Sequence, residues 1–234
     1  MTLKNSTIIS TLLLIVLCMT VSLVFAAEAQ RRSPPAPPEP LPLGFFVTSV
    51  GKGDGANLGG LAGADAHCQK LAAAVGAGNR TWRAYLSTQT INSEPAVNAV
   101  ERIGKGPWGN AKGIQIASDI KNLMYDNSNI NHEHALNEKG EKVPSRVFGA
   151  EQSQHDILTG TQLNGMAFPA GEDRTCSNWT SNSDDGKAYV GHADRYRRTT
   201  PGSGWNASHN SRGCSQSALV SSGGAGLFYC FAAD

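Results

Sequence analysis

Four cysteines carry the chemistry that is easiest to assign in this chain. Five cysteines occur, but Cys18 falls in an apolar N-terminal run, which leaves Cys68, Cys176, Cys214 and Cys230. None of these four has a partner at the short spacing typical of zinc-binding cysteine pairs. An even number of cysteines in an exported chain indicates disulfides, and four cysteines allow three pairings. The residues alone therefore predict two disulfides and leave their connectivity open.

Histidines and carboxylates offer weaker candidates. Asp184 and Asp185 precede a glycine, and together with Asp194 they could supply oxygen ligands to Ca²⁺; a solvated turn is the competing interpretation. The His-Glu-His stretch at 132–134 is interpreted as a surface loop. The adjacent His-Asp pair at 155–156 has the composition of a catalytic dyad, but neighbouring side chains seldom face one another and no nucleophile motif accompanies it. The sequence therefore predicts no catalytic residue and no metal site beyond the weak candidates Asp184, Asp185 and Asp194.

Two tryptophans suggest a ligand-binding surface. Trp108 and Trp205 stand in loops rich in glycine and asparagine, whereas Trp82 and Trp179 have strand-like surroundings and are predicted to be core residues. An exposed ring beside amide side chains suits sugar stacking with hydrogen bonds, whereas the favoured interpretation is that the rings plug the long loops. The candidate ligand-binding residues are Trp108, Asn110, Trp205, Asn206, His209 and Asn210.

The elements that must position these residues begin after an N-terminal export segment. Residues 1–29 have the pattern of a signal peptide, with an uncleaved signal anchor as the alternative, and only that alternative would place the chain in a membrane. Residues 30–42 are a Pro-rich linker. Residues 43–234 form the predicted folded domain. We therefore expect an exported protein that is secreted, periplasmic or displayed at the cell surface.

Composition limits the classes of partner that can be expected for that domain. The chain has 26 glycines, 17% charged residues and a net charge of +1, and the predicted domain holds equal numbers of basic and acidic residues. Nucleic-acid-binding domains usually show a basic excess, so nucleic acid is not an expected partner. The glycine content is typical of long loops, which disulfides can stabilise.

The hydrophobic pattern predicts an α+β fold. Strands are expected at 44–49 and 80–88, and an alanine-rich helix at 62–75 carries Cys68. A second short helix is predicted at 92–103, with Ser93 as its N-cap, and residues 114–124 fit a strand or a helix. Late strands are predicted at 176–180, 188–191, 214–220 and 227–232. Long loops join these elements.

Several stretches resemble a known family. GADAHCQKLAAAVGAGNRTWRAYLST, TCSNWTS, RGCSQSALV and LFYCFA follow one another in the order seen in the C-type-lectin-like fold, in its endostatin-like branch. That branch is the C-terminal domain of multiplexin collagens. Exported bacterial lectin-like proteins are also similar around HDILTG, WNASHNSRGCS and GGAGLFYCF. The resemblance implies a mostly antiparallel twisted sheet with two short helices and two nested disulfides, Cys68–Cys230 and Cys176–Cys214.

The family's metal sites do not carry over. Sugar-binding members use Glu-Pro-Asn or Gln-Pro-Asp and then Trp-Asn-Asp to hold Ca²⁺, but here Glu94-Pro95-Ala96 is misplaced and Ala207 replaces the last aspartate. Calcium is therefore conceivable only without the usual ligand triplets, and no cofactor is expected. The N-terminal histidines that hold zinc in endostatin have no counterpart here. Its heparin-binding arginines are represented only by Arg195, Arg197 and Arg198.

These observations predict an exported lectin-like binding module rather than an enzyme. Its expected partner is a glycan or another extracellular surface. The alternative is an envelope-displayed protein-interaction or structural domain without sugar binding. Formylglycine-generating enzymes use a related fold, but they need reactive cysteines, and the framework engages all four cysteines of this domain.

Overall fold

The computed structural model describes residues 39–91, 93–124, 128–195 and 204–234. Within it, Pro40–Asp234 is a compact unit. The predicted signal peptide with Cys18, most of the Pro-rich linker, and Arg197 and Arg198 lie outside the described residues. No helix in the described ranges has the length and apolarity needed to cross a bilayer.

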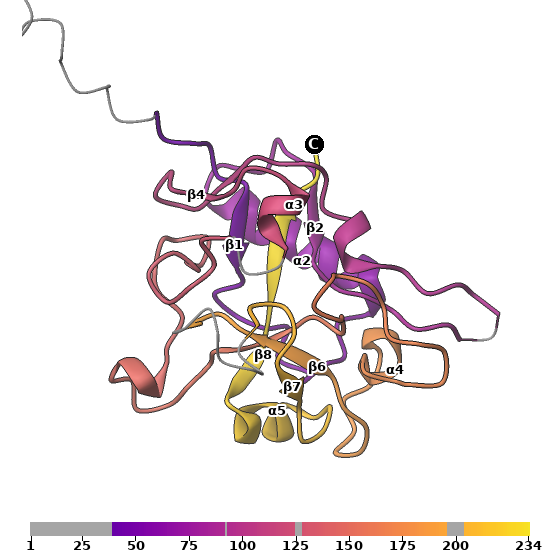
Figure 1. The fold of residues 1–234 in the computed structure, drawn as a ribbon. Coiled ribbons are helices and arrows are strands. Elements are labelled where there is room, and N and C mark those ends of the chain that lie inside the picture. Colours follow the sequence, from indigo (N-terminus) through magenta and orange to yellow (C-terminus); the bar gives the residue numbers. More distant parts are fainter. Residues whose placement is uncertain (1–38, 92, 125–127, 196–203) are drawn as a thin grey trace, which may run out of the picture. The chain divides into compact units, whose positions relative to one another are not determined.

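A mostly antiparallel sheet forms the centre of this unit (Figure 1). Its long strand β8 (Gly224–Ala232) pairs antiparallel with β1 (Phe45–Val47) and β2 (Trp82–Ala84), and parallel with β5 (Asp156–Leu158). Strands β6 (Tyr189–His192) and β7 (His209–Asn210) continue the sheet beyond β5 in antiparallel register. A separate hairpin joins β3 (Trp108–Gly109) to β4 (Gln115–Ala117). The predicted α+β class is confirmed.

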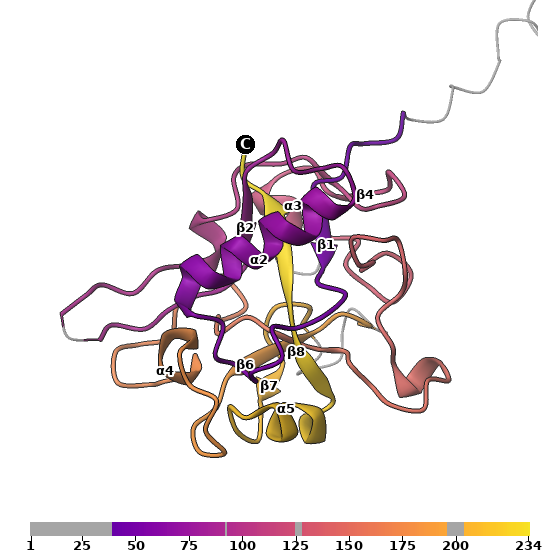
Figure 2. The same ribbon diagram turned by 180° about the vertical axis from the view of Figure 1, so that it is seen from behind.

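The main helix lies across the sheet. Helix α2 (Gly60–Ala74) corresponds to the predicted 62–75 helix, and Figure 2 shows it crossing β1, β2 and β8. Its buried face is formed by small residues, which allow close packing on the strands. Cys68 on this face is bonded to Cys230 of β8, and Cys176 is bonded to Cys214. Both disulfides are those that the family resemblance implies.

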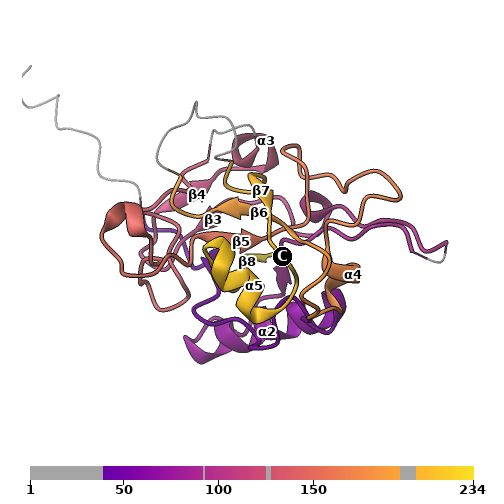
Figure 3. The same ribbon diagram turned by 90° about the horizontal axis from the view of Figure 1, so that it is seen from below.

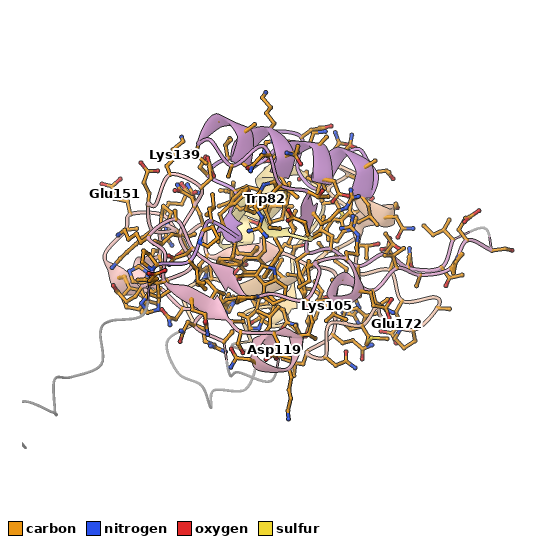
Figure 4. All side chains as sticks on the ribbon, turned by 90° about the horizontal axis from the view of Figure 1, so that it is seen from above. Trp82, Lys105, Asp119, Lys139, Glu151 and Glu172 are labelled. Atoms are coloured by element: carbon orange, nitrogen blue, oxygen red, sulfur yellow. A yellow bond between two sulfur atoms is a disulfide. The ribbon has the colours of Figure 1, made fainter. Side chains whose placement is uncertain are left out.

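Two groups of buried apolar side chains fill the space around the sheet. One contains Phe45, Trp108 and Trp205, and the other contains Trp82, Trp179 and both disulfides. Trp82 lies in the interior beneath α2 in Figure 4, where Lys139, Glu151 and Glu172 lie at the periphery. The core role predicted for Trp82 and Trp179 is confirmed, because they are 1% and 0% exposed.

A buried ion cluster ties α2 to the chain that comes after it. Asp65 of α2 accepts two hydrogen bonds from Arg102, at 2.8 and 2.9 Å, and one from Arg83 at 2.9 Å. It also accepts from the backbone N–H of Ala84 in β2. Arg102 donates in addition to the Ala84 carbonyl. The Asp65 and Arg102 side chains are only 12% and 11% exposed, so this cluster fixes α2 against β2.

Three of the predicted elements differ from the observed ones. Among the described residues of the predicted 92–103 helix, 93–103, only the 3₁₀ turn η1 (Ala99–Glu101) is helical, because Ile91 and Glu94 pair in a β-bridge and Ser93 adopts a left-handed φ of 68°. Residues 176–180 contain the short turn α4 (Cys176–Trp179) instead of a strand. In place of the strand predicted at 214–220, residues 216–222 form helix α5 (Gln216–Ser222). Ser215 caps this helix by accepting from the N–H of Ala218.

The remaining elements occupy the long connections. The ambiguous 114–124 segment contains both alternatives, β4 and then α3 (Ile120–Leu123). The 3₁₀ turn η2 (Arg146–Phe148) precedes β5. Figure 3 shows α5 beside β8 and β5, with β6 and β7 on the other side of β5. The end of the sheet near α5 therefore combines residues from three distant parts of the sequence.

Candidate functional site

Strand pairing brings four polar side chains together at this end of the sheet. Asp156 of β5 lies directly opposite His192 of β6, so their side chains share one face. His209 of β7 is opposite Val190, two residues from His192, and therefore lies diagonally beside His192 on that same face. His155 immediately precedes β5, and its ring stacks on the His192 ring with centroids 4.7 Å apart and planes 5° apart. We call His155, Asp156, His192 and His209 the histidine cluster.

The imidazole nitrogens of this cluster converge on one carboxylate oxygen. Asp156 Oδ1 is 3.3 Å from His155 Nε2, 3.3 Å from His192 Nε2 and 3.6 Å from His209 Nε2. The Nε2 atoms of His192 and His209 are 3.0 Å apart. Donor atoms of His155, Asp156 and His192 all lie within 4.8 Å of one another, which is close enough to hold one metal ion.

Asp156 is buried in an unusual way. Its side chain is 2% exposed, and within the described part of the chain neither carboxylate oxygen has a hydrogen-bond partner. The imidazole nitrogens face it at 3.3–3.6 Å, beyond the usual hydrogen-bond length. A buried carboxylate without hydrogen bonds is costly unless a positive charge compensates it.

A second carboxylate orients the His155 ring. Asp194, two residues beyond His192, accepts from Nδ1 of His155 at 2.7 Å and from the hydroxyl of Ser145. This leaves Nε2 of His155 directed at Asp156. On the exposed side, Nδ1 of His209 lies 2.9 Å from the Asn210 carbonyl, so its Nε2 also faces the cluster.

The carboxylates and imidazoles shift one another's pKa values. Burial opposes protonation of His155, but the hydrogen bond and charge of Asp194 outweigh it and raise the His155 pKa above its ordinary 6.5. The facing carboxylate of Asp156 raises the pKa of His209. Burial opposes ionisation of Asp156 and Asp194, yet their imidazole neighbours hold both pKa values below 3.8. In the metal-free protein these contacts therefore favour the ionised forms of Asp156 and Asp194 and shift His155 and His209 toward their protonated forms.

This charge pattern predicts how stability depends on pH in the metal-free protein. The raised histidine pKa values stabilise the fold below about pH 6.5, and this contribution is lost as the pH rises through the folded-state pKa values. The lowered carboxylate pKa values stabilise it above about pH 3.8, and this contribution is lost on acidification. We expect thermal unfolding in EDTA to show the highest midpoint between about pH 4 and 6.5. A midpoint that keeps rising from pH 6.5 to 9 would contradict the assignment, and Asp194→Asn is expected to flatten the alkaline fall.

A cavity of about 430 Å³ adjoins the cluster at His155. Its other walls come from Arg146, Gln152 and Ser153 and from residues 220–223 at the end of α5. Gly223 lines the cavity next to the cluster, and a Cβ there would stand 3.2 Å from His155 Nε2 and 3.5 Å from Asp156 Oδ2. Its φ of 111° also requires glycine. The glycine therefore leaves the donor atoms approachable from the cavity.

No family model and no curated protein matches this chain. The functional assignment therefore rests on the fold and on the geometry of the side chains.

The candidate ligand-binding surface predicted from the tryptophans needs correction. Trp108 and Trp205 are each 1% exposed, and their indole N–H groups donate to the carbonyls of Ala232 and Leu123. Aromatic loop residues can close a core as well as line a groove, and these two close the core. They are therefore unavailable for stacking on a sugar.

The three asparagines predicted to bind a ligand have side chains that are hydrogen-bonded within the fold. Asn110 is 1% exposed and accepts from the N–H groups of the turn that it begins, and Asn206 is 2% exposed and donates to the carbonyls of Gln162 and Leu163. Asn210 is half-buried and accepts from Arg174. Of the six predicted residues, only His209 both reaches the surface and belongs to the histidine cluster.

The weak metal candidates also have different surroundings. Asp184 and Asp185 are exposed, and Asp184 accepts from Ser215, whereas Asp194 lies beside His155. In the 132–134 stretch, His132 stacks on Phe148 and Glu133 pairs with Lys142. Arg195 is one of the three arginines compared with the heparin-binding arginines of endostatin. It is 7% exposed and donates to the Ser128 carbonyl, so it is not a surface charge.

The histidine cluster is not evident from the sequence. The His-Asp pair at 155–156 has the composition of a catalytic dyad, but both residues also contact side chains outside the pair. His192 and His209 become their neighbours through the β5–β6–β7 register. The available signal is three histidines, each next to a short strand-like segment, and only strand pairing shows that they share one face.

Proposed function

We propose that this chain is an exported binding module of the C-type-lectin-like class, and that it takes an acidic sugar in the cavity between Arg146 and His155. The single observation that carries the proposal is the chemistry of that cavity. Its volume of about 430 Å³ falls within the range of small-ligand sites. Its walls are mainly hydroxyl, amide and backbone groups rather than the apolar side chains of most such sites.

Arg146 supplies the preference for an anion. It is the one permanently charged side chain among the residues that line this cavity. Its Nε donates to the Glu151 carbonyl at 2.8 Å, and within the described residues its terminal amino groups have no partner. A guanidinium group binds a carboxylate in a forked geometry, while hydroxyl and amide groups suit the hydroxyls of a sugar ring. A uronic or sialic acid combines both features.

Two further features support an exported lectin-like module. The α+β fold with nested disulfides agrees with what the family resemblance implies, and disulfides are typical of proteins that fold in an oxidising compartment. The four cysteines of the domain are paired, so they supply no reactive thiol of the kind that the related enzymes need. Recognition fits these features better than catalysis.

A glycan array probed in EGTA tests the proposal. We expect signal on glycans that end in an acidic sugar, retained after Ca²⁺ is chelated because the usual calcium triplets are missing. Arg146→Ala is expected to weaken binding by roughly 10- to 100-fold, the worth of a charge-assisted hydrogen bond. Lys105→Ala removes an equal charge from an exposed site outside the cavity and should leave affinity unchanged.

Two results would reject this function. Equal affinity of wild type and Arg146→Ala would place the ligand elsewhere. Absence of signal on every glycan would remove the sugar and favour the protein-interaction alternative.

A further inference from the structure

Imidazole nitrogens of three histidines surround one carboxylate oxygen of Asp156, and the donor atoms of His155, Asp156 and His192 are close enough together to hold a single metal ion. A tetrahedral Zn²⁺ with bonds of about 2.0–2.1 Å places neighbouring donor atoms about 3.3 Å apart. Four separations within the cluster are 3.0, 3.3, 3.3 and 3.6 Å. The three separations from Asp156 Oδ1 and the one between His192 and His209 are therefore close to those of ligands that share an ion.

The buried carboxylate is an independent observation that points to a cation. Asp156 is 2% exposed, and both of its oxygens lack a hydrogen-bond partner among the described residues. Two Nε2 atoms that face each other at 3.0 Å, as in His192 and His209, also need either a shared proton or a shared ion between them. One divalent cation satisfies the carboxylate and both nitrogens at once.

The surrounding groups have the arrangement that supports metal-bound histidines. A ligating imidazole usually donates its other N–H to a carboxylate or a carbonyl, which fixes the tautomer. His155 does so to Asp194, which Ser145 holds in place, and His209 does so to the Asn210 carbonyl. Ser208 Oγ lies 3.2–3.3 Å from the ring nitrogens of His192.

Access and selectivity agree with this assignment. The His209 side chain is 43% exposed, so an ion can enter from the surface and reach the buried Asp156. A set of imidazole nitrogens with one carboxylate suits zinc better than Ca²⁺ or Mg²⁺, which prefer oxygen ligands.

We propose that this protein binds one Zn²⁺ through His155, His192 and Oδ1 of Asp156, and that the partly exposed His209, which faces Asp156 and His192, moves in as the fourth ligand. Asp194 and Ser145 act as positioning residues, because they orient His155 without touching the ion. This site shares His155 with the wall of the cavity but does not use Arg146, and its test uses no sugar, so it stands whether or not the protein recognises a sugar.

Zinc titration of EDTA-stripped, dialysed protein tests the site, with ZnCl₂ alone as the probe and a chromophoric chelator as competitor. We expect one Zn²⁺ per chain. Asp156→Asn is expected to lower the affinity by more than about 100-fold, because it removes a direct ligand, and Asp194→Asn by about 10- to 100-fold. His67→Asn is the matched control: His67 is an imidazole on α2 that contacts the Val50 carbonyl, so its loss should leave the affinity unchanged.

A second measurement keeps the test valid if a variant folds poorly. Zinc X-ray absorption of loaded wild-type protein should show a four-coordinate nitrogen–oxygen shell with imidazole scattering. The proposal is overturned by a stoichiometry well below one, by wild-type affinity in Asp156→Asn, or by an absorption spectrum without imidazole.

Discussion

Loss of the Cys68–Cys230 disulfide is expected to lower the free energy of unfolding by about 5 kcal/mol. The bond joins residues 162 positions apart, so it greatly restricts the unfolded chain. A typical domain has only about 5–15 kcal/mol of stability, and the Cys68→Ala/Cys230→Ala double variant should therefore be close to unfolding at room temperature. Denaturant unfolding monitored by circular dichroism measures the loss.

The second disulfide is the internal control for this prediction. Cys176–Cys214 closes a loop of 38 positions, so the same relation gives about 4 kcal/mol for Cys176→Ala/Cys214→Ala. The two losses should keep this order. A larger loss for the shorter loop would show that packing around the sulfurs, rather than chain entropy, determines their contribution.

The second large effect is expected at the buried ion cluster on α2. Replacing Asp65 with alanine leaves the Arg102 guanidinium, whose side chain is 11% exposed, without its carboxylate partner. Breaking a buried pair from one side typically costs about 3–5 kcal/mol. The Ala84 N–H in β2 also loses its acceptor. We expect Asp65→Ala to lower the denaturant midpoint accordingly, with little change in slope.

Arg83→Ala provides the comparison. Arg83 contacts the same carboxylate, but its side chain is 45% exposed, and such pairs are worth about 0–1 kcal/mol. If Arg83→Ala and Asp65→Ala destabilised the protein equally, the stabilising pair would be the exposed one, and the role assigned to Arg102 would be wrong.

Local patterns predict the elements that local chemistry determines. The apolar stretches around Phe46, Trp82 and Phe228 form strands, and the alanine-rich segment around Cys68 forms α2. Errors arise where a single side chain decides the conformation. Ser215 caps α5 in a segment whose apolar residues suggest a strand.

The histidine cluster could not be predicted in this way. Asp156, His192 and His209 are on three strands whose register is set by the packing of the whole sheet. The choice between a ligand-stacking and a loop-plugging role for the two tryptophans could not be made from the sequence for a related reason. Trp108 and Trp205 are in glycine- and asparagine-rich sequence, but the long connections fold back and bury both rings against Phe231. Burial of a loop residue depends on contacts that no local pattern records.

The pairing of β8 also determines the order in which the fold can assemble. Phe45 pairs with Phe231, Trp82 with Ala232 and Asp156 with Gly224. Strands β1, β2 and β5 therefore all need β8, which comes after them in the sequence, as their pairing partner. Chains dominated by such distant contacts fold slowly, because the intervening loops must close before the contacts form. The central sheet of this protein can therefore be completed only after residues near 230 have been synthesised.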